Sequence, residues 1–287
     1  MPALGGLPRP VVTEAVELAL REDFGHGARD LTTEATIPPD TVTQGVLAAR
    51  APLRLAGLQL AEAAFAALDP AVRLTARHCD GAAVAAGAVL AEVAGPARAI
   101  LGAERVALNF LGRLCGIATA TATAVAATAG TSARITGTRK TTPGWRRLES
   151  YAIRCGGGQD HRLGLDDGVL IKDNHIALAG GVAAAVTAAR QAAGHMVRVA
   201  VEVETPAQLD AALAAGAEVI LLDNLDLDAL GAAVRRIDGR ALAEASGGLK
   251  PAEIAAVAAT GVDVISLGWL THSAPAADIG LDIPIPE

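Results

Sequence analysis

Short apolar runs and amphipathic segments alternate regularly through the second half of the chain, from about residue 133 onward. Each cycle covers roughly 20–35 residues, which is the size of a βα unit. Proline stands near the start of three expected helices, where the first turn tolerates it. We expect strands at residues 133–138, 168–171, 197–203, 219–222, 241–245 and 263–267, and helices at 143–155, 181–193, 206–215, 227–236 and 251–259.

Repeated strand–helix units predict a parallel sheet with right-handed crossovers. A closed TIM barrel has eight such strands, whereas this pattern supplies six. We therefore predict an α/β fold built on an open or incomplete TIM-like α/β barrel.

The first part of the chain mixes helical and strand patterns without regular alternation, which is typical of a small α+β domain. We expect an α+β N-terminal domain over residues 1–115 and the barrel domain over 116–287, with the last residues packing back on the N-terminal domain. Residues 21–40 are interpreted as a turn-rich loop. The other expected elements are helices at 11–21, 57–68 and 96–114 and strands at 41–50, 53–56, 72–77 and 89–93.

Composition narrows the range of partners. The 287 residues are 52% hydrophobic but only 2% aromatic, so Ala, Val, Leu and Ile must form the core. The formal charge of −7 and the lack of stacking side chains argue against nucleic acid and against an anionic membrane surface as partners. Residues 114–133 carry no charge, but they are rich in Ala and Thr, which favours a buried helix over a membrane span.

The cysteines and the N-terminus bear on localisation. Cys79, Cys115 and Cys155 show no CxxC spacing, which fits buried thiols in a reducing compartment better than disulfides or zinc. The first residues contain no apolar core of a signal peptide. We expect a cytoplasmic protein.

Cationic residues gather in one stretch of this acidic chain, residues 137–176. The chain has 24 Lys and Arg residues, and only three are lysines: Lys140, Lys172 and Lys250. Two of the three lie in this stretch. A lysine in a chain that otherwise uses arginine suggests a need for a compact, mobile ammonium group.

The ends of the expected strands carry the candidate chemistry, because reacting groups of such barrels lie where strands end and helices begin. Every expected strand ends in a charged group or a glycine-rich turn. These ends are Thr138, Arg139 and Lys140; Lys172, Asp173, Asn174 and His175; Glu202 and Glu204; Asp223 and Asn224; Ser246, Gly247 and Gly248; and Gly268 with its neighbours Leu267 and Trp269.

The glycine-rich turns at residues 246–248 and 267–269 offer backbone N–H groups to a phosphate. Arg139, Lys140, His161, Arg162 and Lys172 would face a second anionic group, since Arg grips carboxylates with two hydrogen bonds. Tight turns that need positive φ remain the alternative for the glycines.

Glu202 and Asp223 are the acids on the opposite strands. They are suited to ribose hydroxyls or to Mg2+ bound to a diphosphate. Capping of the following helices remains the alternative for each of them. His175 has two equal interpretations, an orienting role and a structural hydrogen bond.

Several motifs in this chain resemble those of the quinolinate phosphoribosyltransferase family. They are TRKTTPG (138–144), YAIRCGGG (151–158), HRLGL (161–165), LIKDNHI (170–176), EVE (202–204), LLDN (221–224), SGGL (246–249) and THS (271–273). The segment AERVALNFLGRLCGIAT is also similar, so the resemblance covers nearly the whole chain.

The resemblance implies a reaction of quinolinate with phosphoribosyl pyrophosphate that requires Mg2+. The products would be nicotinate mononucleotide, pyrophosphate and CO2, within de novo NAD biosynthesis. It also implies a homodimer whose sites are shared between subunits, and further assembly into a higher oligomer is left open.

The same resemblance assigns roles to residues. Arg139, His161, Arg162 and Lys172 would bind the quinolinate carboxylates, and Lys140 would lie near the quinolinate and the diphosphate. The catalytic residues would be Lys140, Lys172, Glu202 and Asp223. Glu202 and Asp223 would face the ribose and the metal, which the diphosphate would mainly hold. Residues 246–248 and Gly268 would bind the 5′-phosphate, and Arg105 would reach into the partner's site.

This chain departs from the family pattern at Gly137, at Gln159 with Asp160, and at Trp269. None of these departures removes a presumed ligand, although Trp269 would narrow the phosphate pocket. Three other functions stay open: a lyase with a Schiff base on Lys172, a non-catalytic nucleotide-binding protein, and a related pyrophosphorylase with another acceptor.

Overall fold

The computed structural model describes residues 5–284. Within that range the chain divides into two compact units. The first comprises residues up to 122, residues 147–157 and residues from 273 onward, and the second comprises residues 123–146 and 158–272.

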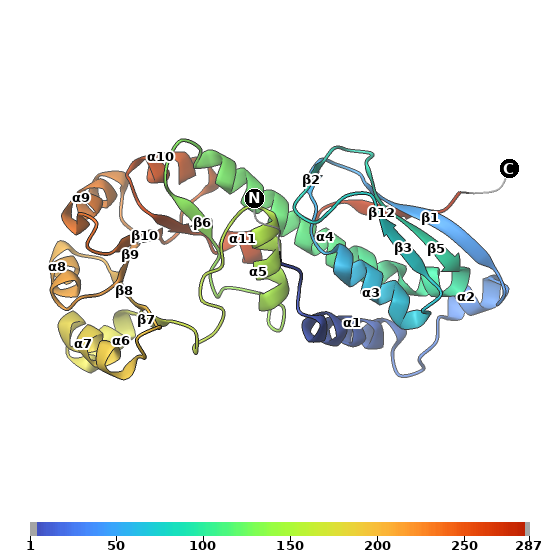
Figure 1. Cartoon of the computed structure of the whole chain (residues 1–287), viewed down its shortest axis with the longest axis horizontal. Helices are drawn as coiled ribbons and strands as arrows, with labels where there is room; N and C mark the ends of the chain where they lie inside the picture. Colours follow the sequence, from blue (N-terminus) through green and yellow to red (C-terminus); the bar gives the residue numbers. More distant parts are fainter. Residues whose placement is uncertain (1–4, 285–287) are drawn as a thin grey trace. The chain divides into compact units, whose positions relative to one another are not determined.

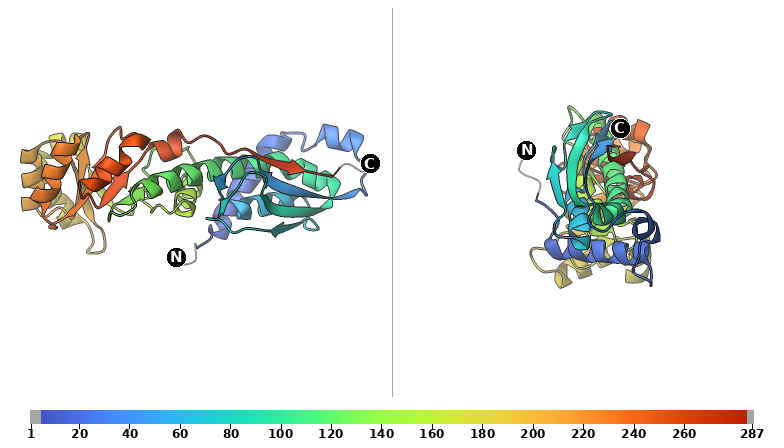
Figure 2. Two further views of the ribbon diagram at one scale, coloured as in Figure 1. Left: turned by 90° about the horizontal axis from the view of Figure 1, so that it is seen from above. Right: turned by 90° about the vertical axis from the view of Figure 1, so that its right-hand side faces the viewer.

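A four-stranded antiparallel sheet forms the centre of the first unit, in the order β12-β1-β5-β3. Its strands are β1 (Val42–Ala49), β3 (Arg73–Ala76), β5 (Val89–Pro96) and β12 (Ile279–Asp282). The last strand pairs with the first, and Figures 1 and 2 show red β12 beside blue β1. Two short strands, β2 (Leu53–Arg54) and β4 (Ala83–Val84), pair separately.

Helices cover one face of this sheet. They include α3 (Leu58–Leu68) and α4 (Ala97–Ala127), and the unit also holds α1 (Arg9–Phe24), α2 (Leu31–Thr36) and most of α5 (Arg146–Cys155). The loop expected at residues 21–40 therefore contains one helix, which Asp30 caps through the Thr33 N–H at 2.9 Å.

Helix α4 is one continuous element where the sequence suggested two. It is long and apolar enough to cross a membrane, but 56% of its most apolar 18-residue stretch is buried inside the protein. A Cβ at Gly116 would lie 2.0 Å from the Pro275 carbonyl oxygen, so this glycine lets the returning chain pack directly on the helix. The burial agrees with a core helix.

Buried polar groups fix α5 within the first unit. Tyr151 donates a hydrogen bond of 2.7 Å to the Asp80 carboxylate, which also accepts the Gly57 N–H at 2.8 Å. Glu149 is fully buried, and Arg113 of α4 pairs with it at 2.8 Å. Replacing only one member of such a buried pair is strongly destabilising, because it leaves the other charge buried without compensation.

The second unit is built on six parallel strands in the order β6-β11-β10-β9-β8-β7. The end strands β6 and β7 do not pair with each other in the described residues, so the barrel is open. The strands are β6 (Arg134–Thr136), β7 (Val169–Ile171), β8 (Val199–Val203), β9 (Val219–Asp223), β10 (Leu242–Ser246) and β11 (Val264–Ser266).

Helices lie on the outer side of this sheet, among them α6 (Asp173–Ala179), α7 (Val182–Ala192), α8 (Pro206–Ala214) and α9 (Leu227–Ile237) (Figure 1). The unit also contains η1 (Pro251–Glu253) with α10 (Ile254–Ala259), and the short helix α11 (Trp269–His272) after β11. The predicted open α/β barrel with a separate α+β part is confirmed. The helix expected from residue 143 begins only at Arg146, and the pattern did not reveal α6 or α11.

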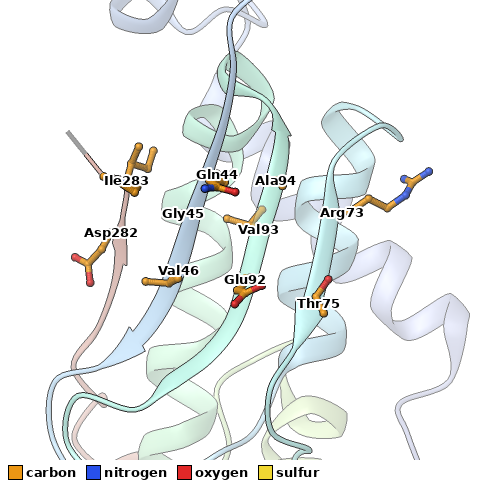
Figure 3. A pocket seen from close by; sticks show the side chains of 11 residues that line it. Gln44, Gly45, Val46, Arg73, Thr75, Glu92, Val93, Ala94, Asp282 and Ile283 are labelled. Carbon is orange, nitrogen blue, oxygen red and sulfur yellow. The ribbon is translucent and has the colours of Figure 1, made fainter. Parts of the chain in front are cut away.

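A pocket of about 420 Å3 lies on the sheet face of the first unit that is opposite the helices (Figure 3). Gln44, Val46, Thr75 and Glu92 line it, and none of them belongs to the candidate chemistry. Nearby charges are already paired, as in Arg77 with Glu92.

We predict that the protein loses stability as pH rises above about 9. Burial raises the pKa of the Cys115 and Cys155 thiols from 9.0 to about 12 and also raises the pKa of Tyr151. The unfolded thiols therefore lose protons first, and each contributes about 1.4 kcal/mol of lost stability per pH unit in that window. Urea denaturation at several alkaline pH values measures the effect.

Cys155→Ala should flatten this pH dependence, whereas Cys79→Ser should not, because Cys79 is exposed. A urea midpoint that stays constant for the wild type into strongly alkaline pH would contradict the argument.

Candidate active site

A cavity of about 490 Å3 opens at the carboxyl ends of the barrel strands. All of its lining residues belong to the second unit. They are Thr138, Arg139, Lys140, His161, Arg162, Leu170, Lys172, Glu202, Leu221, Asp223, Asn224, Glu244, Ser246, Gly247, Gly248 and Ser266.

Lys172 lies between the end of β7 and the start of α6. The ring Nδ1 of His175 accepts its backbone N–H at 3.0 Å, so His175 fixes the turn that presents this lysine. The ammonium group of Lys172 forms an ion pair of 2.7 Å with Glu202 at the end of β8. The Glu202 side chain is only 12% exposed, so this pair compensates an acid that is largely removed from water.

Lys140 is held through its backbone. Its N–H donates to Thr138 Oγ1 at 3.0 Å, and its carbonyl accepts from Thr271 Oγ1 at 2.8 Å. A Cβ on Gly268 would lie 3.2 Å from Lys140 Cδ, so a side chain there would crowd the lysine. Gly268 therefore serves the position of Lys140 without lining the cavity.

Arg139 and Arg162 form no ion pair with a carboxylate of the described residues. Asp167 acts on Arg162 only through its charge, and Arg162 Nη1 donates to the Gly168 carbonyl at 3.0 Å. The Nε atoms of both are buried and make no hydrogen bond to any described residue. Burial lowers the pKa of Arg162, and the neighbouring charge of Arg139 lowers it further. Two adjacent guanidinium groups with unused donors are suited to an anion that carries more than one charge.

His161 uses both ring nitrogens inside the protein. Its Nδ1 accepts the backbone N–H of Arg162 at 2.8 Å, and its Nε2 lies 3.2 Å from the Glu244 carboxylate. Glu244 is 5% exposed and also accepts a short hydrogen bond from Ser266 Oγ.

The opposite side of the cavity combines Asp223 with a glycine turn. Asn224 Nδ2 donates to Asp223 at 2.6 Å, and the Asn224 N–H donates to the Ser246 carbonyl at 3.0 Å. Gly247 has φ +94°, and a Cβ there would lie 2.5 Å from Asn224 Oδ1. The turn therefore requires glycine, and its backbone lies open to the cavity.

A metal ion bound by protein groups alone does not fit this site. The described residues contain no group of three or more His, Cys, Asp or Glu side chains arranged to hold one. Glu202 and Asp223 supply two carboxylates, and that number suits Mg2+ when a substrate phosphate completes the coordination.

Comparison with known sequences decides the family. The quinolinate phosphoribosyl transferase N-terminal domain matches residues 30–115, and the C-terminal domain of the same family matches residues 117–282. The chain belongs to the quinolinate phosphoribosyl transferase family.

Members of this family from distant organisms are similar over nearly their whole length. A probable carboxylating nicotinate-nucleotide pyrophosphorylase of Bacillus subtilis is 44% identical over 92% of this chain and 90% of its own. The corresponding Mycobacterium leprae protein is 45% identical over 94% and 96%. The nicotinate-nucleotide pyrophosphorylase structure from Francisella tularensis, 37% identical, superposes with a TM-score of 0.93 over 99% of this chain and 100% of that one.

Most of the candidate residues named from the sequence lie in this one cavity. Four do not line it. Leu267 is buried, Gly268 packs against Lys140, and Trp269 Nε1 donates to the Leu249 carbonyl at 3.1 Å, which ties down the glycine turn. Arg105 is exposed on α4 in the first unit.

The sequence interpretation missed Glu244 and Ser266 as site residues. A usable signal was present, because side chains alternate along a strand and residues two apart share a face. Glu244 precedes Ser246 by two positions, and Ser266 precedes Gly268 by two. The missed lining residues also include Leu170 and Leu221. Asn224, expected with Asp223 at the end of its strand, does line the cavity.

We predict that Arg139→Met leaves the ligand-free protein as stable as the wild type or more stable, by up to about 2 kcal/mol. The substitution removes one of two neighbouring, unpaired charges. An added dianion such as sulfate should raise the wild-type melting temperature and raise that of the variant much less. Thermal denaturation with and without sulfate measures both effects.

Arg50→Met is the matched control, because Arg50 is partly exposed and paired with Asp282. It should keep the stabilisation by the dianion. Equal stabilisation of wild type and Arg139→Met would argue against an anion site at these guanidinium groups.

Proposed function

We propose that this protein transfers the phosphoribosyl group of phosphoribosyl pyrophosphate to quinolinate and releases pyrophosphate and CO2. The product, nicotinate mononucleotide, belongs to NAD biosynthesis. The observation that carries the proposal is that Arg139 and Arg162, whose buried Nε donors have no partner among the described residues, share one cavity with a glycine turn and two acids. The names of the relatives, such as the decarboxylating quinolinate phosphoribosyltransferase of Nicotiana tabacum, support the same reaction.

The dicarboxylate end of the substrate would occupy the cationic side. Arg139 and Arg162 each offer a fork of N–H donors, and charge-assisted bonds to carboxylates are the strong ones. Lys172 adds a third cation at the same rim. In this proposal Thr138 holds the turn that presents Arg139 and Lys140.

The 5′-phosphate would lie against the glycine turn, residues 246–248. Backbone N–H groups free of side chains make such turns favourable for phosphate. Trp269 acts on this turn through the Leu249 carbonyl, so its role in the proposal is to hold the turn in place. In this proposal Leu267 and Gly268 are supporting residues. Leu267 is buried directly after β11, and Gly268 leaves room for the Lys140 side chain.

Glu202 and Asp223 would face the ribose, where positive charge develops as the anomeric bond breaks. Mg2+, bound mainly by the diphosphate of the substrate, would neutralise the departing pyrophosphate. Lys140 would lie beside the same diphosphate. Loss of CO2 then needs no other cofactor, because the positively charged ring nitrogen stabilises the carbanion.

The lyase alternative is disfavoured by one contact. A Schiff-base lysine must present a free amine to the substrate carbonyl, whereas the Lys172 Nζ is held by Glu202 at 2.7 Å.

The proposal includes a cytoplasmic homodimer with shared sites. Arg105 is exposed on α4 and lines no part of the barrel cavity, so within one subunit its charge has no described role there. We propose that it completes the site of the partner subunit.

The decisive assay combines quinolinate, phosphoribosyl pyrophosphate and Mg2+ and follows pyrophosphate and CO2. We expect turnover that a chelator abolishes. Nicotinate should be a poor substrate, because it leaves one guanidinium unpaired at a cost of roughly 2–4 kcal/mol, or about 30- to 1000-fold in kcat/KM.

Arg162→Ala should remove most of this preference for the dicarboxylate. Similar kcat/KM values of the wild type for quinolinate and nicotinate would contradict the assignment of the cationic side.

Shared sites predict complementation between two inactive variants. Arg105→Ala and Lys140→Ala should each be nearly inactive alone. After refolding together, some mixed dimers would contain one intact site, so part of the activity should return. A mixture of two separately tagged Lys140→Ala preparations is the control for subunit exchange, and exchange without recovery would sink the shared site.

A further inference from the structure

Glu244 is a buried carboxylate beneath the candidate active site. It lies in the middle of β10, is 5% exposed, and lines both the rim cavity and a second cavity of about 400 Å3 at the amino-terminal ends of the barrel strands. Burying a carboxylate costs folding free energy unless its oxygens are hydrogen-bonded. The contacts of Glu244 therefore indicate its role.

The contacts of Glu244 form a chain that leads to Arg162. Ser266 Oγ and His161 Nε2 both contact the same carboxylate oxygen, Oε1. The other ring nitrogen, His161 Nδ1, accepts the Arg162 N–H at 2.8 Å. Thus one carboxylate connects β11, the loop after β6 and the backbone of a guanidinium-bearing residue.

This chain determines the tautomer of His161. A backbone N–H can only donate, so Nδ1 carries no proton while it accepts the bond from Arg162. The ring proton must then be on Nε2, where Glu244 accepts it. With both nitrogens engaged inside the protein, His161 acts on the cavity through the position of Arg162.

A second histidine in the same site is used in the same way. His175 Nδ1 accepts the Lys172 N–H at 3.0 Å. In both cases an imidazole ring holds the backbone of the residue that carries the cation. His175, however, has no described carboxylate behind its ring, whereas His161 has Glu244.

We propose that Glu244 is a positioning residue for the dicarboxylate subsite. Its carboxylate fixes the tautomer and orientation of His161, and His161 in turn fixes Arg162 against the Arg139 guanidinium. The proposal rests on the proposed function, because it assigns Arg162 to the quinolinate carboxylates. Phosphoribosyl pyrophosphate, at the other side of the cavity, should be unaffected by it.

The alternative is that Glu244 serves only to join β10 and β11. Asp263 provides a matched control on the same two strands, because its carboxylate accepts the Ala243 N–H at 2.8 Å. It lies at the start of β11 and lines neither of the two cavities. Removal of Asp263 should therefore cost stability alone.

The experiment compares Glu244→Ala, Glu244→Gln and Asp263→Ala in the full-length protein. Calorimetry measures quinolinate binding, steady-state kinetics measure both KM values, and nitrogen NMR of labelled histidines reads the tautomer of His161. His161→Gln identifies the resonances. Thermal unfolding measures the stability of each variant.

We expect Glu244→Ala to weaken quinolinate binding roughly 10-fold or more, the loss of about one strong hydrogen bond. The KM for phosphoribosyl pyrophosphate should stay unchanged. The His161 spectrum should change from one tautomer to a mixture. Glu244→Gln retains an acceptor oxygen, so it should restore the single tautomer and most of the affinity.

Two results would overturn the proposal. One is a single, unchanged His161 tautomer with normal quinolinate affinity in Glu244→Ala. The other is an equal loss of affinity in Asp263→Ala, which would make the effect structural.

If Glu244→Ala does not fold, a mixed His161 tautomer in Glu244→Gln would also count against the proposal. If the wild type fails to bind quinolinate, the proposed function fails, while the tautomer comparison still tests the link between Glu244 and His161.

Discussion

Two guanidinium groups, Arg139 and Arg162, are held close together at the barrel rim, and neither forms an ion pair with a carboxylate of the described residues. Asp167 offsets only part of their mutual repulsion. Such an arrangement repels itself and loses hydration, so the folded chain must enforce it. Much of the architecture serves this purpose. The carboxyl ends of parallel strands meet at one rim, and the loops that follow them bring the cations together there.

The site is therefore organised through the backbone. Histidine rings accept the backbone N–H groups of Arg162 and Lys172. Thr138 accepts the backbone N–H of Lys140, and Thr271 donates to the Lys140 carbonyl. Because these bonds do not use the cationic heads, Arg139 and Arg162 keep donors for a ligand, among them both Nε atoms. Two heads are partly engaged inside the protein: Arg162 Nη1 donates to the Gly168 carbonyl at 3.0 Å, and the ammonium of Lys172 compensates Glu202.

Local pattern was sufficient to predict the six barrel strands, because each is a short apolar run followed by an amphipathic helix. It was insufficient where long-range contacts decide the structure. α5 follows β6 in the chain, yet most of it belongs to the first unit, where Asp80 and Arg113 bind Tyr151 and Glu149. No local signal reveals partners separated by 71 and 36 residues.

The residues of the candidate site likewise divide into those that local sequence predicted and those that it did not. Charged residues directly after strands were identified because the barrel rule looks at strand ends. Glu244 was missed because it lies inside a strand, where a carboxylate has no capping or solvent role. The expected effect of Trp269 on the phosphate pocket stays a prediction, since its indole Nε1 donates to the Leu249 carbonyl next to the turn.

The two histidines of the site are engaged with backbone N–H groups, and the cationic side chains that face the cavity include Arg139 and Arg162. Here His161 and His175 each accept a backbone N–H at Nδ1, so while those bonds persist each ring serves as a fixed strut. Arginine keeps its charge at any physiological pH. The positive side of the cavity therefore depends on residues whose charge is constant, held in place by residues whose tautomer is fixed.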